Sequence, residues 1–288
     1  MTPAGLATQA FVDAGWSARL REDRRRATKL QTPSQRQATE TLLQRALALG
    51  AEAVALTGST VRGQRTAISD LDLTIIGQRP DLSGIQEDVD VYAASKKAFW
   101  ERLLAGDDYI QWTLRFGCIL HDDGILQTAS RYIQENGLEP SAERKLIQAH
   151  RGLSLACSVL ESGDLEAARE QCRAALTTIA RWLLIANGEF PLSRDELSNQ
   201  LLTLDCFDLA AALHSLIHCE PSSDEMRTGL RVGEELMNTP PRRAATPPPT
   251  SRKRRQENAR GALSPNSPQR SDFRSHPGAP ESHEEAGR

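Results

Sequence analysis

Aromatic side chains and long apolar segments are scarce in this sequence. Phe, Trp and Tyr together make up 5% of the 288 residues, although 39% of the residues are apolar. No apolar run approaches the ~20 residues that a helix needs to cross a bilayer. The first residues also lack the basic-then-apolar order of a secretory signal. We therefore expect a cytoplasmic protein that has no membrane partner.

Paired cysteines are also missing. The chain has five cysteines and no C-x-x-C pair, so it lacks the framework of a disulfide-rich secreted domain or of a zinc ribbon. We expect reduced thiols. The five are Cys118, Cys157, Cys172, Cys206 and Cys219.

Charge and proline are distributed very unevenly along the chain. Residues 239–288 hold nine of the fifteen prolines and ten Lys or Arg against five Asp or Glu, a net charge of +5. The remaining residues carry a net charge of −8. Such a tail cannot bury enough apolar area to offset its chain entropy, so we predict that it is disordered. Its segment "SRKRRQ" is either a nucleic-acid or acidic-partner contact or a solubilising sequence.

The hydrophobic pattern predicts an α+β fold. Capping residues, glycines and apolar spacing predict helices and four short strands in the first half, and helices alone after Pro140. We expect a helical extension over 1–32, a mixed sheet domain over 33–139, a helical bundle over 140–238 and the tail over 239–288. Predicted strands lie in 51–57, 71–77, 87–93 and 118–124, and predicted helices in 34–49, 95–105, 108–116, 141–161, 165–187, 193–202, 205–218 and 223–237.

Two aspartates lie at the start of the apolar stretch "LDLTIIG": one directly precedes it and the other is its second residue. Asp70 and Asp72 are one residue apart, so on a strand they project from the same face while Leu71 and Leu73 face the core. Carboxylates this close repel each other unless a cation lies between them, and oxygen ligands suit Mg²⁺. The next predicted strand offers Asp88 and Asp90, and we expect Asp90, which lies deeper in that strand, to complete the set.

A glycine turn precedes these aspartates. Gly58 and Ser59 follow a predicted strand and open a short helix, where backbone N–H groups and a hydroxyl can hold a phosphate. Arg62 and Arg65 would add positive charge at the same place. A phosphate-binding turn beside metal-binding carboxylates indicates phosphoryl chemistry on a nucleoside triphosphate.

Residues 51–92 resemble the nucleotidyltransferase superfamily, which includes DNA polymerase beta and the aminoglycoside adenylyltransferases. The matching pattern is Leu-Thr-Gly-Ser at 56–59, ten intervening residues, and Asp-Leu-Asp-Leu at 70–73. The resemblance implies an enzyme that transfers a nucleoside monophosphate from ATP or another NTP to a hydroxyl and releases pyrophosphate. It implies Mg²⁺ or Mn²⁺ on Asp70, Asp72 and Asp90, with Gly58, Ser59 and Arg62 on the phosphates.

The helical second half resembles the HEPN-like or substrate-binding bundles that follow minimal nucleotidyltransferase domains in bacteria. Its role would be to recognise the acceptor. The net negative charge of residues 1–238 favours a small cationic, aminoglycoside-like molecule or a protein as acceptor. An RNA or tRNA end is an alternative. A different class remains open, in which the fold senses nucleotide or neutralises a partner, as an antitoxin does, without turnover.

Several weaker patterns have competing interpretations. Arg144 and His150 match the R-x(4–6)-H pattern of HEPN ribonucleases, which also arises by chance in helices. His214 and His218 have zinc-ligand spacing, but a half-buried, hydrogen-bonded pair is the better interpretation. Trp112 is expected to pack in the core. Arg115 would line a nucleotide or acceptor pocket, Asp107 and Asp108 would cap a helix, and the Arg-rich residues 19–29 would form a solvated helix face or an anion contact.

Overall fold

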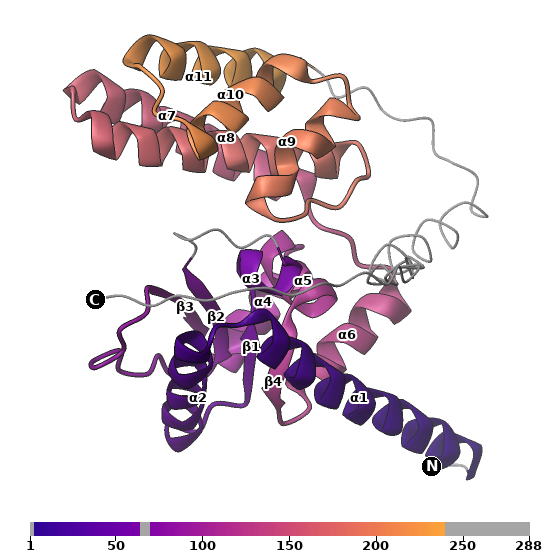
Figure 1. Cartoon of the computed structure of the whole chain (residues 1–288). Coiled ribbons are helices and arrows are strands. Elements are labelled where there is room, and N and C mark those ends of the chain that lie inside the picture. Colours follow the sequence, from indigo (N-terminus) through magenta and orange to yellow (C-terminus); the bar gives the residue numbers. More distant parts are fainter. Residues whose placement is uncertain (1–2, 64–69, 240–288) are drawn as a thin grey trace, which may run out of the picture. The chain divides into compact units, whose positions relative to one another are not determined.

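The computed structural model describes residues 3–63 and 70–239 (Figure 1). Residues 1–243 form one compact unit, and residues 244–288 form a second unit that lies outside the described residues, as does nearly all of the predicted disordered tail. Arg65 also lies outside them. The predicted α+β class is confirmed, because a four-stranded mixed sheet is combined with many helices.

The sheet consists of four short strands in the order β3-β2-β1-β4. The β2 and β3 strands are parallel, whereas β1 is antiparallel to both β2 and β4. Three of the four strands fall within the segments predicted from sequence, and β3 extends one residue beyond its predicted segment. The four are β1 (Ala53–Leu56), β2 (Leu71–Ile76), β3 (Val89–Ala94) and β4 (Cys118–Asp122).

Helices cover both faces of this sheet. Leu71, Leu73 and Ile75 face one hydrophobic core, which includes Leu42 and Ala46 of the second helix. The opposite core contains Ile76, Phe99, Ile110 and Leu126. The helices of this part are α1 (Pro3–Leu30), α2 (Pro33–Ala48), α3 (Gly58–Arg62), α4 (Lys96–Leu104), α5 (Asp108–Phe116) and α6 (Ile125–Asn136). Alternation along β2 therefore places Leu71 and Leu73 in the core, as predicted.

The α1 helix lies along β4, the strand at one edge of the sheet. Arg24 donates a hydrogen bond to the carbonyl of Leu120 at 2.7 Å, and Asp23 accepts one from the backbone N–H of Ile119 at 3.2 Å. Arg19 donates to the carbonyl of Leu114 at 2.6 Å. The Arg-rich segment is thus in part the predicted solvated face, since Arg21 and Arg25 are exposed, while Arg19 and Arg24 bind backbone carbonyls of α5 and β4.

Five further helices form a bundle with a hydrophobic core of its own (Figure 1). Fully buried Leu176, Ile179 and Leu213 are members of that core. Ser193 and Glu196, whose spacing in the sequence is that of a capping box, form one at the start of α9. The five are α7 (Ala142–Ser162), α8 (Leu165–Ala186), α9 (Arg194–Leu202), α10 (Phe207–His218) and α11 (Ser223–Asn238).

Two local predictions need correction. The cap of α2 is Thr32, whose hydroxyl accepts from the N–H of Gln35, and not Ser34, which lies inside the first turn. The α6 helix was not predicted. It begins at Ile125, directly after the turn at Gly124 that follows β4. Asp122 caps this helix from the end of the strand by accepting hydrogen bonds from the N–H groups of Leu126 and Gln127.

Two other expectations concern cysteines and membranes. All five cysteines are free thiols in the structure, in agreement with the prediction. Burial raises the pKa of the Cys118 and Cys172 thiols to about 11, so both are protonated at neutral pH. Within the described ranges, no helix combines the length and the apolar character that crossing a bilayer requires.

Candidate active site

The acidic residues lie where β2 and β3 begin. Asp72 is the second residue of β2 and is the register partner of Asp90, the second residue of β3. Asp70 directly precedes β2 and is exposed, as is Asp90, whereas Asp72 is partly buried. The parallel pairing of these strands therefore brings the predicted acids to one end of the sheet. Asp88 is also exposed but precedes β3.

The Gly58 turn lies directly against Asp72. The backbone N–H of Thr57 donates to the carbonyl of Asp72 at 2.9 Å, continuing the antiparallel pairing of β1 with β2. A Cβ atom at Gly58 would overlap the Asp72 carboxylate, and the backbone there has φ +71°. The absence of a side chain at residue 58 thus leaves room for the carboxylate beside the start of α3.

The environment of Asp72 disfavours its charged form. Burial, and after it the negative charges of Asp70 and Asp90, raise the pKa of this carboxyl to about 6, against a smaller opposing effect of Arg194. Three carboxylates that repel one another across a partly buried site form a cluster that a cation would stabilise.

A layer of hydroxyl groups lies next to the acids and was not predicted from the sequence. The hydroxyl of Tyr109 is 2.8 Å from that of Thr74, which shares a face of β2 with Asp72, and 3.5 Å from that of Thr57. The Tyr109 ring meets that of Tyr92 edge to face at 5.2 Å. Burial raises the pKa of Tyr109, so its phenol stays protonated and supplies a hydrogen-bond donor. In the sequence, the only sign of this layer is that these residues are threonine and tyrosine, which carry hydroxyl groups.

Arg62 has a partner that sequence reasoning did not identify. Its guanidinium donates two hydrogen bonds, at 2.6 and 3.0 Å, to the carboxylate of Glu196 at the start of α9. It also stacks over the ring of Phe116 at 4.9 Å. Although burial raises the pKa of Glu196, hydrogen bonds from Arg62 and Ser193 lower it by more, so this carboxyl is charged at neutral pH. The structure therefore places Arg62 in a link between α3 and the helical bundle.

The described residues contain no group of three or more His, Cys, Asp or Glu side chains arranged to hold a metal ion. His214 and His218 have their rings 4.5 Å apart, but both are exposed rather than half-buried as predicted. The carboxylates of Asp70, Asp72 and Asp90 would need further ligands, such as water and phosphate oxygens, to complete a coordination sphere.

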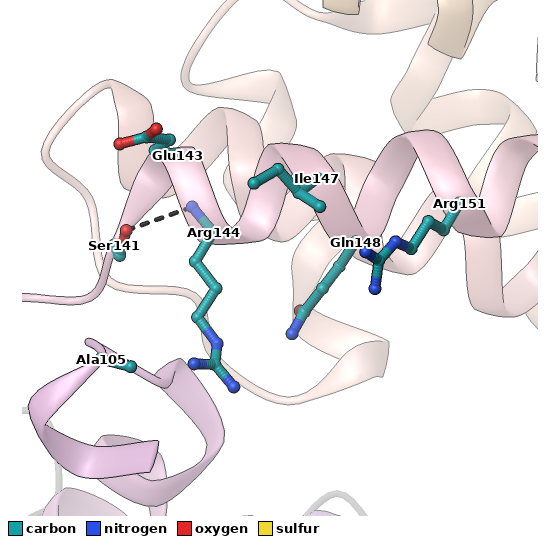
Figure 2. A pocket seen from close by; sticks show the side chains of 7 residues that line it. All are labelled: Ala105, Ser141, Glu143, Arg144, Ile147, Gln148 and Arg151. Atoms are coloured by element: carbon teal, nitrogen blue, oxygen red, sulfur yellow. Dashed lines mark hydrogen bonds between the residues drawn. The ribbon is translucent and has the colours of Figure 1, made fainter. Parts of the chain in front are cut away.

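A cavity opens at the start of α7, apart from the aspartates (Figure 2). It has a volume of about 330 Å³ and is lined by residues that include Arg144, Gln148 and Arg151. Figure 2 shows Arg144 and Gln148 directed to the same side of α7, away from Glu143. Arg144 lies 3.7 Å from a carboxylate oxygen of Asp107, and His150, its partner in the HEPN-like pattern, is exposed.

The remaining candidates have structural roles. Trp112 is buried in the core, as predicted. Asp107 caps α5 by accepting from the N–H groups of Tyr109 and Ile110, as predicted, but Asp108 does not share that role. Asp108 is buried and pairs with Lys145 at 2.5 Å and with Arg181 at 2.6 Å. Arg115 stacks on Phe190 at 4.0 Å.

No protein-family model matches the chain. No curated protein matches it either. Among solved structures, it is similar to a nucleotidyltransferase-like protein from Exiguobacterium sibiricum 255-15, with 17% sequence identity and a TM-score of 0.35. That match covers 70% of this chain and 74% of the other.

Proposed function

We propose that this protein is a metal-dependent nucleotidyltransferase that moves a nucleoside monophosphate from an NTP to a hydroxyl group and releases pyrophosphate. The observation that carries the proposal is the meeting of Asp72, its strand partner Asp90 and the Gly58 turn at one end of the sheet. A glycine turn that opens a helix beside clustered carboxylates suits phosphoryl transfer better than it suits a purely structural role.

The donor set fits a divalent cation of the Mg²⁺ type. Asp70, Asp72 and Asp90 offer only oxygen ligands, and burial together with the charges of Asp70 and Asp90 raises the pKa of Asp72. Mg²⁺ is usually held by one or two carboxylates and takes its other ligands from water and substrate phosphates, so an incomplete protein site is what this cation uses. When bound, it would neutralise charge on the phosphates of the NTP.

The residues of the chain would perform the remaining steps. Backbone N–H groups at Gly58 and the Ser59 hydroxyl would hold the β- and γ-phosphates. Asp90, exposed and next to Asp72, would accept the proton of the attacking hydroxyl. The hydroxyl oxygen then bonds to the α-phosphorus while the bond to the β-phosphate oxygen breaks, and pyrophosphate leaves.

In this proposal Arg62 does not bind the phosphates, which differs from the role predicted for it from the sequence. Its guanidinium is held by Glu196, and it would have to leave that carboxylate to reach a phosphate. We therefore assign the phosphate contact to Gly58 and Ser59, and to Arg62 the task of joining α3 to α9. The net negative charge of residues 1–238 favours a small cationic molecule or a protein as acceptor.

The experiment compares four forms of the full-length protein with each of the four α-³²P-labelled NTPs, Mg²⁺ and a cell extract. We expect the wild type and Asp88→Asn to label an acceptor, and Asp72→Asn and Asp90→Asn to lose at least a hundredfold in labelling rate. Asp88→Asn is the matched control because it is a nearby exposed aspartate that has no strand partner among the acids. Equal labelling by all four forms would contradict the proposed roles.

A second candidate is a nucleotide-binding protein without turnover. It is favoured by the lack of a preformed three-ligand group in the part of the chain that the structure describes. If the wild type binds NTP but labels no acceptor from any extract, while Asp72→Asn binds equally well, this second function replaces the first.

A further inference from the structure

The segment between α8 and α9 is anchored at one end to the sheet domain through Arg181. Nη1 of Arg181 donates to the carbonyl of Leu192 at 3.0 Å. Nε of the same guanidinium donates to Asp108 in α5 at 2.6 Å. Arg181 and Asp108 are both largely buried, so the place of Leu192 is fixed relative to α5.

The first turn of α9, which follows this segment directly, is anchored through Glu196. Its carboxylate accepts both hydrogen bonds from Arg62 of α3 and also closes the capping box with Ser193. One residue, Arg194, therefore lies midway between two anchors, two residues after Leu192 and two residues before Glu196. Both anchors connect it to elements that carry or adjoin the candidate active site.

The Arg194 side chain is available to bind a ligand. It is exposed, and within residues 3–63 and 70–239 it makes no hydrogen bond or ion pair, although its positive charge acts on Asp72. Arg173 of α8 lies within electrostatic range of both Arg194 and Asp70, but it forms an ion pair with Glu170. Of these two arginines, Arg194 is the one whose charge is not balanced by a paired carboxylate.

We propose that Arg194 binds the β- and γ-phosphates of the nucleoside triphosphate, supplying the bundle's part of the phosphate site opposite Gly58 and Ser59. This inference rests on the proposed function. A guanidinium matches phosphate oxygens through two parallel hydrogen bonds, which a lysine cannot form. Because the backbone on both sides of Arg194 is already fixed, little additional ordering is needed when the phosphates bind.

The test is the affinity of the full-length protein, with Mg²⁺, for each NTP and for the matching nucleoside monophosphate. The variants are Arg194→Ala, Arg194→Lys and Arg151→Ala, the last being an exposed arginine of α7 whose loss changes the net charge equally. We expect Arg194→Ala to weaken NTP binding by about tenfold or more and to leave monophosphate binding within about twofold. Arg194→Lys should recover part of the loss, and Arg151→Ala should resemble the wild type.

The possible failures can be told apart. If the wild type prefers NTP to monophosphate and Arg194→Ala keeps that preference, the role of Arg194 is wrong and the proposed function stands. An equal weakening of both ligands, or an equal effect of Arg151→Ala, would show general charge attraction and would also overturn it. If the wild type binds no NTP at all, both the proposed function and this inference fail. Unchanged thermal unfolding of Arg194→Ala would confirm that its folding is intact.

Discussion

At Gly58, two constraints act on a single residue. The backbone adopts φ +71°, a region in which residues with a Cβ atom are strained, and a Cβ there would also overlap the Asp72 carboxylate. Gly50 shares the first constraint, with φ +77°, but not the second, because nothing lies within 4 Å of its hypothetical Cβ. The pair therefore separates backbone strain from crowding of the carboxylate.

We predict that Gly58→Ala is more damaging than Gly50→Ala. The strained backbone alone should reduce the free energy of unfolding by about 1 kcal/mol at residue 50. At residue 58 the displaced Asp72 should raise the total to about 3 kcal/mol and should also weaken NTP binding. Urea unfolding monitored by circular dichroism measures the first quantity, and nucleotide titration the second. Equal losses of stability would mean that Asp72 moves aside without cost.

The sequence allowed the positions of the acids to be predicted, but not their surroundings. Alternation along a strand is local, so the shared face of Asp72 and Thr74 follows from spacing alone. The Glu196 partner of Arg62 is 134 residues away, and Tyr109 reaches Thr74 across 35 residues. Such pairs depend on the packing of whole elements, for which one sequence contains no local signal. The roles of the acids themselves stay predictions.

Among the elements, the pairing of α1 with β4 shows how the sheet edge is protected. An edge strand presents backbone groups without partners, which favours pairing with other chains. Here Asp23 accepts from the N–H of Ile119, and Arg24 donates to the carbonyl of Leu120. Burial raises the pKa of Asp23, which means that the charged form of its carboxyl is disfavoured there. We infer that Asp23 stabilises the edge mainly by accepting a hydrogen bond.

Substitutions at Asp23 should therefore distinguish charge from hydrogen bonding. Asp23→Asn keeps an acceptor oxygen and should change the free energy of unfolding by less than about 1 kcal/mol. Asp23→Ala leaves the Ile119 N–H without a partner and should cost about 2 kcal/mol. Thermal and urea unfolding measure both values, with light scattering to detect association through β4. A loss of the same size in both variants would indicate that the charge is what matters.

Most elements were predictable because their signals are local. The capping box of α9 and the extent of α5 follow directly from residue order. The α6 helix was missed because it begins after a glycine with φ +100° and takes its cap from Asp122, a residue of the preceding strand. A cap that belongs to another element is visible only once both elements are packed.

At the scale of the whole compact unit, Asp108 joins the sheet domain to the bundle. Its carboxylate is buried between Lys145 of α7 and Arg181 of α8. Burial raises its pKa, but the two positive charges lower it by more, so the net pKa lies below the ordinary value of 3.8. The ion pairs therefore contribute stability that is fully present above pH 3.8 and is lost as the pH falls through the lowered pKa.

We predict that Asp108→Asn destabilises the protein by about 3 kcal/mol at pH 7, because two buried cations lose their counter-charge. The difference from the wild type should shrink as the pH falls below 3.8 and through the lowered pKa of Asp108, where the wild-type carboxyl itself becomes protonated. Unfolding curves at several pH values measure this. Asp208→Asn, at an exposed aspartate of α10, is the control and should change stability by less than about 0.5 kcal/mol. A constant difference across this pH range would contradict the prediction.

The parallel pairing of β2 and β3 also determines how far apart in the sequence Asp72 and Asp90 must be. Since both strands start at the same end of the sheet, the connection over residues 77–88 must return along the full length of a six-residue strand, about 20 Å. A shorter connection is limited by reach, whereas a longer one costs only about 0.6 kcal/mol for each doubling of length. The interval between the two acids therefore has a minimum but no fixed value, so a search for the second acid at a constant spacing will overlook proteins built on the same plan.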